Sequence, residues 1–182
     1  LSDRAVERSQ ACTSPSFHWA WPPRLDESYI YMRFGGTPPE QHVYALDAAL
    51  TLIDEEGGIE ATAARHRRIA TAVHAAVEGW GTSGPWEVNA LEPHRAAAVT
   101  CVLAGELDAD TLRLTARDRF RVSLGGAMLE LTGRAFRIGH LGDLNEAMIL
   151  GALGGIETAM SYLDLPHGDG VSAAVAALAK SA

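Results

Sequence analysis

Lysine is nearly absent from this chain of 182 residues, since Lys180, two residues from the end, is the only one. No side chain in residues 1–179 can therefore offer a primary amine for covalent chemistry with a carbonyl group. Cysteine is scarce as well, because Cys12 and Cys101 lie far apart without CxxC spacing. This argues against a disulfide framework or a zinc site and favours a reducing, cytoplasmic location.

Basic residues and long apolar segments are also limited. Fifteen basic residues stand against 23 acidic ones, which gives a formal net charge of −8 at pH 7. Such a chain would repel phosphates, so we expect no nucleic-acid partner. No apolar run approaches the length that spans a bilayer, so we expect no membrane association. Residues 1–4 lack a signal-peptide pattern and an initiator methionine, and we expect that residues are missing upstream.

Hydrophobic spacing and turn residues predict the elements of the first half. Residues 29–34 have the pattern of an extended segment. Thr37 suits the N-cap of a following helix, with Pro38 in its first turn and Glu40 completing a capping box. The apolar face of this helix is Val43, Leu46, Leu50 and Ile53. Two glycines, 57 and 58, end it.

The remaining pattern alternates helices and strands. Helices are predicted at about 59–79, from 107, at 144–163 and at 171–179, and strands at 96–103, 120–124 and 135–138, with a turn at 125–126. The inward residues are Ile69, Val73, Ala76 and Val77 of the first of these helices, and Leu144, Met148, Ala152, Ile156, Ala159 and Leu163 of the third. This order predicts an α+β fold with helices packed on one face of a small sheet.

One arginine has the best pattern for chemistry. Arg137 alternates with Phe136 and Ile138 along a predicted strand, so its side chain points away from theirs. Gly139 and Gly142 follow in a turn that permits close backbone approach. A guanidinium held there can bind a carboxylate through two parallel hydrogen bonds. The alternative is an exposed strand arginine, or one paired with an acidic residue of the turn.

A second candidate lies just before the first long helix. Gly35 and Gly36 can expose backbone N–H groups to an anion, and the helix dipole assists. The Thr37 hydroxyl could donate to a phosphate oxygen. The alternative is an ordinary capped helix. Among other groups, His66 and His74 lack a third ligand at metal spacing, so packing or surface roles are expected.

These segments resemble class V aminotransferases, which use pyridoxal phosphate, and in particular the alanine–glyoxylate and serine–glyoxylate types. Residues 136–145 are similar almost residue for residue to the segment that leads from a strand arginine into the last long helix. Residues 34–38 resemble the phosphate-binding segment, and the letters EEG at 55–57 and RH at 65–66 follow in the family's order. The resemblance covers about residues 1–165.

The resemblance implies roles for four residues. Arg137 would bind the substrate's α-carboxylate. Thr37, Gly36 and Phe34 would contact the phosphate of pyridoxal 5′-phosphate held by the neighbouring subunit of a homodimer. Phe34 stands where many members have a tyrosine, so it has no hydroxyl to offer and its expected role is packing.

The resemblance also implies an architecture and a reaction. Residues 1–45 would be the end of the large domain of a fold type I enzyme, residues 46–165 the small C-terminal domain, and residues 166–182 a helical tail. The reaction would be transamination of a small amino acid, of the alanine or serine type, with a 2-keto acid such as glyoxylate or pyruvate. The family's Schiff-base lysine is expected just upstream, so the chain alone should be inactive.

Two alternatives stay open. One is a non-catalytic, truncated module of the same fold that serves binding or oligomerisation. The other is a different pyridoxal-phosphate enzyme, such as a cysteine desulfurase or a lyase. A desulfurase needs a reactive cysteine on a mobile loop, and Cys101, in an apolar strand pattern, is a poor candidate.

Overall fold

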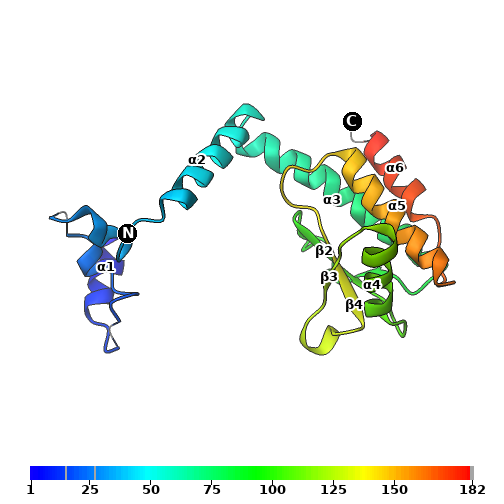
Figure 1. Cartoon of the computed structure of the whole chain (residues 1–182), viewed down its shortest axis with the longest axis horizontal. Helices are drawn as coiled ribbons and strands as arrows, with labels where there is room; N and C mark the ends of the chain where they lie inside the picture. The colour runs from blue at the N-terminus through cyan, green and yellow to red at the C-terminus, as the bar shows by residue number, and fades with distance from the viewer. Residues whose placement is uncertain (15, 27, 181–182) are drawn as a thin grey trace. The chain divides into compact units, whose positions relative to one another are not determined.

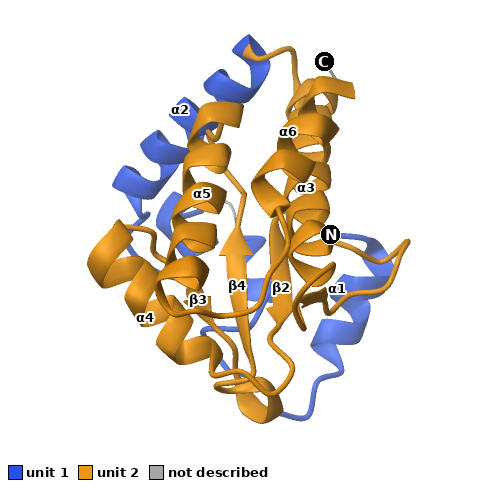
Figure 2. Cartoon of the chain, turned by 90° about the vertical axis from the view of Figure 1, so that its right-hand side faces the viewer, with its two compact units in different colours: residues 1–55 blue, residues 56–182 orange. Residues whose placement is uncertain are grey.

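The structure is a computed structural model that describes residues 1–14, 16–26 and 28–180. The chain divides into two compact units, Leu1–Glu55 and Glu56–Ala182, which Figure 2 shows in different colours. The domain boundaries expected at residues 45 and 165 remain a prediction.

Unit 1 is built from short helices and turns. Its elements are α1 (Asp3–Gln10), η1 (Pro22–Arg24), η2 (Ile30–Phe34) and α2 (Glu40–Glu55). The extended segment expected at 29–34 is wrong, because the 3-10 helix η2 forms there and Met32 N–H donates to Tyr29 O at 2.9 Å. The described part of this unit offers no partner strand, so local bonds satisfy backbone groups that a sheet would otherwise satisfy.

Helix α2 begins at Glu40, three residues after the N-cap expected at Thr37. A residue that precedes proline is disfavoured in the α region, so two successive prolines keep Thr37 and Pro38 out of the helix. The first full helical bond runs from Val43 N–H to Pro39 O, 3.1 Å. The helix ends before the glycine pair at 57 and 58, as expected.

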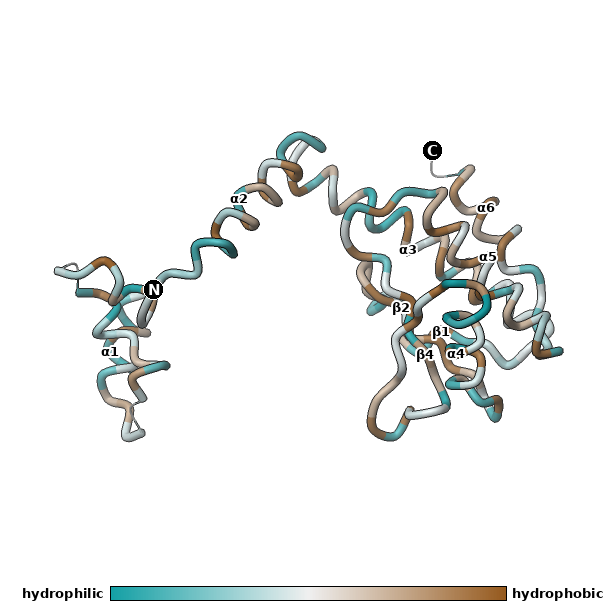
Figure 3. Tube along the Cα trace, viewed as in Figure 1, coloured by the Kyte–Doolittle hydropathy of each residue, from teal (hydrophilic) through white to brown (hydrophobic). Residues whose placement is uncertain are grey.

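Apolar side chains of unit 1 are exposed in this chain. On the expected inner face of α2, Val43, Leu46 and Leu50 are about half exposed and Ile53 is partly exposed. No residue of α2 is buried. Figure 3 shows brown, apolar positions spaced along this helix. Every buried apolar side chain among the described residues belongs to unit 2, which therefore contains the hydrophobic core.

Unit 2 combines an antiparallel sheet with helices (Figure 1). The strands are β1 (Glu87–Val88), β2 (Val99–Leu103), β3 (Gly125–Gly126) and β4 (Ala135–Gly139), in the order β1-β2-β4-β3. The helices are α3 (Ile59–Gly81), α4 (Ala109–Phe120), α5 (Glu146–Tyr162) and α6 (Gly170–Lys180), with a 3-10 turn η3 (Leu129–Leu131). β2 pairs with β4 so that Cys101 lies opposite Arg137.

Helices cover one face of this sheet. Val102, Phe136 and Ile138 are buried on the covered face, whereas Cys101 and Arg137 alternate onto the other face and are partly exposed. Figure 1 shows the helices of unit 2 on one side of the strands. The expected α+β fold, with helices on one face of a small sheet, is confirmed.

The strand expected at 120–124 is wrong. α4 continues to residue 120, and Arg121 adopts φ +61°, which ends the helix. Val122 N–H then donates to Ala116 O at 3.0 Å. Because this bond caps the helix, the Val122 N–H is not available to pair with a neighbouring strand. The glycine pair at 125–126, expected as a turn, pairs with β4 as β3.

The core is completed by α5 and α6. The buried residues of α5 are Ile149, Leu153, Ile156, Ala159 and Met160. Ile156 and Ala159 were expected there, but Met148, also expected inward, is 51% exposed. The helix begins at Glu146, and its buried face starts at Ile149, one residue after Met148. The inward residues expected for α3 are confirmed, since all four are fully buried.

A single carboxylate joins three helices of unit 2. Glu157 Oε2 on α5 accepts from Trp80 Nε1 at 2.7 Å on α3. The same oxygen accepts from the backbone N–H groups of Gly170 and Val171 at 2.9 Å, at the start of α6. A negative charge there also complements the positive end of the helix dipole.

Candidate functional site

Arg137 lies in the middle of β4, between β2 and β3. Its Nε donates to Gly126 O at 2.9 Å. A Cβ added to Gly125 would lie 3.4 Å from Nε and 3.3 Å from the Arg137 Cβ, so the absent side chain leaves the arginine room to lie along β3. The glycine pair therefore fixes the direction of the guanidinium.

The outer edge of this guanidinium is unused within the described residues. No ion pair there includes Arg137, and Glu146, the first residue of α5, pairs with Arg68. The structure therefore does not pair Arg137 with that acid. Since Nε is held by a carbonyl, Nη1 and Nη2 remain as two parallel donors of the geometry that a carboxylate accepts.

Cys101 is the cross-strand neighbour of Arg137 on the open face of the sheet. Burial raises the pKa of its thiol, and the charge of Arg137 opposes that shift only in part. A thiol with a raised pKa on a paired strand is a poor nucleophile, which disfavours desulfurase chemistry.

The turn that follows β4 is held by side chains of α3. His66 Nδ1 lies 2.7 Å from Thr62 O, an acceptor, so Nδ1 carries the proton and Nε2 accepts from Gly142 N–H at 3.1 Å. Arg65 Nη1 donates to the carbonyls of Gly142 at 2.8 Å and Leu144 at 3.0 Å. These contacts join residues 76 to 79 positions apart, and the only sequence signal for them was the order of the EEG and RH letters.

Glu56 holds the other side of Arg65. Oε1 accepts from Arg65 Nε at 2.5 Å and Oε2 from Nη2 at 2.9 Å, while the Thr62 hydroxyl adds a bond of 2.8 Å. These bonds, with that of Arg65 the largest, lower the pKa of the Glu56 carboxyl from 4.5 to about 2.

The lowered pKa of Glu56 makes a testable prediction. Because the folded pKa lies below the unfolded one, the stabilising contribution is present above about pH 4.5 and is lost as the pH falls toward 2. A carboxyl carbon NMR titration of the chain should give a midpoint near 2. The variant Arg65→Met should move that midpoint back toward 4.5. A midpoint near 4.5 in the unmodified chain would show that the pair does not form.

His140 comes directly after β4, and its side chain lies in the core. It is fully buried, and its Nε2 lies 2.9 Å from the Thr100 hydroxyl. Its Nδ1 has no hydrogen-bond partner in the described chain, and its ring stands edge-on to that of His74 at 6.4 Å. Burial lowers the pKa of His140, so the ring is neutral near pH 7. His140 therefore packs beneath the sheet and does not face the open side with Arg137.

Phe34, Gly36 and Thr37 lie in unit 1, whereas Arg137 lies in unit 2. Thr37 is exposed, and neither its hydroxyl nor its amide N–H has a hydrogen bond among the described residues. Apart from Gly36 itself and its two chain neighbours, no atom of the described residues lies within 4 Å of the place where a Gly36 side chain would begin. The segment thus offers a free hydroxyl, a free amide and open space to an anion.

Arg24 lies beside Gly35 of this segment, a proximity that the sequence did not predict. Its guanidinium donates to Phe17 O at 3.0 Å, to His18 O at 2.7 Å and to Ala20 O. A Cβ at Gly35 would lie 2.5 Å from Arg24 Nη2, so a larger residue there would displace the end of the Arg24 side chain. Gly35 also adopts φ +70°, which favours glycine.

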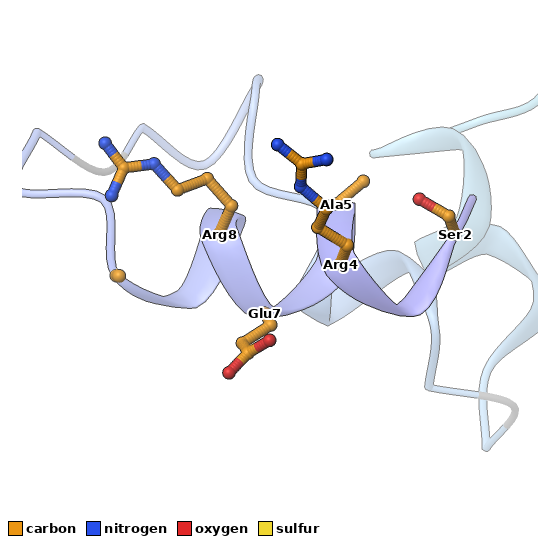
Figure 4. Close-up of a pocket in the computed structure, with 6 residues that line it drawn as sticks. Ser2, Arg4, Ala5, Glu7 and Arg8 are labelled. Atoms are coloured by element: carbon orange, nitrogen blue, oxygen red, sulfur yellow. The ribbon is translucent and has the colours of Figure 1, made fainter.

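A surface hollow in unit 1 lies along α1 and is shown in Figure 4. Arg4 and Arg8 point to one side of the helix and Glu7 to the other. None of the four residues expected to bind substrate or cofactor lines it.

Among residues 1–14, 16–26 and 28–180, no group of three His, Cys, Asp or Glu side chains could hold a metal ion. In the same ranges no helix is long and apolar enough to cross a membrane.

Several known proteins similar to this chain are aminotransferases. Serine–glyoxylate aminotransferase of Arabidopsis thaliana is 34% identical over 175 residues, which cover 95% of this chain and 43% of that protein. The Methylorubrum extorquens enzyme of the same name is 38% identical over 147 residues, 78% of this chain and 35% of that protein. The crystal structure of pyridoxamine–pyruvate aminotransferase from Mesorhizobium loti superposes with a TM-score of 0.84 and 28% identity, over 100% of this chain and 47% of that one. No protein-family model matches the chain.

The fold and these relatives define a class of pyridoxal-phosphate proteins. The chain belongs to the class V aminotransferase family, so the resemblance inferred from the sequence is confirmed. It spans less than half the length of the curated relatives that it matches, which agrees with the expected C-terminal part.

Proposed function

We propose that the protein carrying this chain transfers an amino group between a small amino acid and a 2-keto acid, with pyridoxal phosphate as cofactor. Arg137 would bind the α-carboxylate of both substrates. One observation carries this proposal. The Arg137 guanidinium is held by Gly126 O, and its outer edge is free on the open face of the sheet. Relatives named for transamination with glyoxylate support it.

The carboxylate grip explains how one site can serve two substrates. An amino acid and a 2-keto acid share the carboxylate and differ at the next carbon. Two parallel bonds to Nη1 and Nη2 fix both oxygens of that carboxylate in a plane, which also fixes the direction of the neighbouring carbon. Arg137 can therefore present the amino group of the donor and the carbonyl group of the acceptor at the same place.

We also propose that Thr37 and Gly36 contact the cofactor phosphate. When bound, pyridoxal phosphate supplies a ring that withdraws electrons from the substrate's α-carbon. The free hydroxyl and amide of Thr37 and the open space beside Gly36 fit a phosphate group. Phe34 is 51% exposed and has no hydroxyl, so its proposed part is packing against the bound group.

The proposed reaction also requires groups that residues 1–179 do not supply. The lysine that the reaction requires is not among residues 1–179 and would be supplied from elsewhere in the full-length protein. We propose a homodimer in which Thr37 serves the neighbouring subunit's cofactor, as the family resemblance implies. The exposed apolar face of unit 1 supports burial of this unit against further protein. The cytoplasmic location remains a prediction.

A donor pair tests this proposal. The full-length protein with pyridoxal phosphate and glyoxylate should form glycine from L-alanine or L-serine, measured by chromatography. Ethylamine, which is alanine without its carboxylate, should give glycine at least about 100-fold more slowly because two charge-assisted bonds are lost. Equal rates with alanine and ethylamine would contradict carboxylate recognition. A complete lack of glycine from both amino acids would contradict the proposed reaction.

A further inference from the structure

Both polar backbone groups of Gly142 are bound by side chains of α3. Its N–H is bound by His66 and its carbonyl by Arg65. Gly142 lies at the tip of the turn between β4 and α5, where it adopts φ +103°. Figure 1 shows this yellow segment passing beside α3. Two neighbouring residues of one helix thus fix the tip of a distant turn.

The turn has few other tethers within the described part of the chain. His140 N–H donates to Ala98 O at 2.9 Å where the strand ends, and Leu144 N–H makes a local bond to Gly142 O. Beyond the turn, Asn145 caps α5 through its bond to Met148 N–H, and Glu146 pairs with Arg68 of α3. Between those two ends, the contacts with α3 are what hold the tip.

The tip belongs to the same strand-to-helix segment as the proposed carboxylate site. β4 ends at Gly139, only two residues beyond Arg137 on the same face of the sheet. Within the part of the chain that the structure describes, no atom other than those of Gly139 and its two chain neighbours lies within 4 Å of the place where a Gly139 side chain would begin. The strand end is therefore open beside the arginine. Leu141, which follows, is exposed. Movement of this turn would therefore change the border of the space in front of Arg137.

The donor arrangement around Arg65 shows that its orientation is fixed. Nε and Nη2 are held by the two oxygens of Glu56, and this leaves Nη1 for the two turn carbonyls. The planar guanidinium fixes the angle between the bonds to Glu56 and the bonds to the turn carbonyls. A lysine, with a single ammonium group, could not make both sets of bonds at once. Glu56 thus acts on the turn through Arg65.

We infer that Arg65 and His66 are positioning residues that hold the Gly142 turn against α3 and thereby keep the wall of the carboxylate site in place. This inference rests on the proposed function of Arg137. The turn borders the contact between Arg137 and the substrate carboxylate, which is made throughout the reaction. A looser turn therefore weakens the binding of substrate and of transition state alike. Its loss therefore raises KM more than it lowers kcat.

Two matched pairs of variants of the full-length protein test the inference. Asn resembles His at Nδ1 and lacks an acceptor at the Nε2 position, whereas Gln can place an oxygen there. His66→Asn should therefore lose the Gly142 bond and His66→Gln should keep it. Arg65→Met removes the carbonyl contacts. Arg67→Met removes an exposed arginine of the same helix whose side chain has no hydrogen bond or ion pair among the described residues.

The expected result has two independent readouts. His66→Asn should raise KM for the amino donor about fivefold, because about one net hydrogen bond to the turn is lost. Arg65→Met, which loses two such bonds, should raise it by at least about fivefold, and kcat should stay within about twofold in both variants. Hydrogen exchange of the backbone at 139–145, measured without substrate, should accelerate by a similar factor. His66→Gln and Arg67→Met should stay within about twofold of the parent in both measurements.

Each other outcome has a distinct meaning. Unchanged exchange in His66→Asn and Arg65→Met would show that the tether does not hold the turn, which overturns the inference. Faster exchange with unchanged KM would show a tether without a role in the site, which also overturns it. Failure of the proposed function would show differently, as an Arg137→Ala variant with unchanged kcat/KM while exchange at 139–145 still responds to Arg65→Met.

Discussion

Arg137→Ala is expected to lower kcat/KM for the amino donor by about 100- to 1,000-fold in the full-length enzyme. Two charge-assisted hydrogen bonds to a carboxylate contribute roughly 3–4 kcal/mol together, and each 1.4 kcal/mol is a factor of ten. Michaelis constants should rise sharply. Turnover should also fall, because a misplaced α-carbon reacts slowly. Steady-state kinetics with alanine and glyoxylate would measure both effects.

Two further variants sharpen this prediction. Arg137→Lys should also be poor, because a single ammonium group cannot supply two parallel donors or hold the Gly126 carbonyl at the same time. Arg134→Ala is the matched control, since Arg134 is exposed in the loop before β4. It should change kcat/KM by less than about twofold. An Arg137→Ala enzyme as active as that control would refute the assigned role.

Phe136→Ala is expected to lower the free energy of unfolding by about 3–5 kcal/mol, the range for removal of a buried phenylalanine. The side chain is fully buried on β4 and packs edge-on against Trp86, with ring centroids 6.2 Å apart. A loss of this size is a large share of the stability of a typical domain. Denaturant unfolding of the chain, followed by far-UV circular dichroism, would measure it.

An exposed leucine in the same hairpin provides the control for Phe136. Leu129 is 83% exposed in the loop that leads to β4, so Leu129→Ala should change the unfolding free energy by no more than about 0.5 kcal/mol. If Phe136→Ala also stayed within about 1 kcal/mol, the assignment of β4 to the core would be wrong. The alternation that turns Arg137 outward would then be wrong as well.

The helices could be predicted from sequence because their signals are local. Ile69 and Val73 show helical spacing, and Asp108 caps α4 through its bond to Asp110 N–H at 2.9 Å. Strands depend on partners that lie elsewhere in the chain. Residues 29–34 have strand-like composition without a strand beside them, and two glycines without any apolar pattern pair as β3.

The candidate site was only partly accessible to the same reasoning. Alternation on β4 and the flanking glycines indicated the direction of Arg137, and the resemblance gave that direction a meaning. Arg65 and His66 bind Gly142, which lies more than 70 positions away in the sequence. Spacing and turn signals are local, so they do not predict a contact at that separation. The bond from Arg137 Nε to Gly126 O was missed for a related reason, since it depends on the unpredicted pairing of β3.

The free edge of Arg137 is expected to receive a substrate carboxylate. A crystal structure of the full-length protein with pyridoxal phosphate and propionate, which has the carboxylate but no amine, tests it directly. We expect both propionate oxygens within about 2.7–3.1 Å of Arg137 Nη1 and Nη2, with Nε still on the Gly126 carbonyl. Propionate bound beside the cofactor but away from that guanidinium would contradict the account.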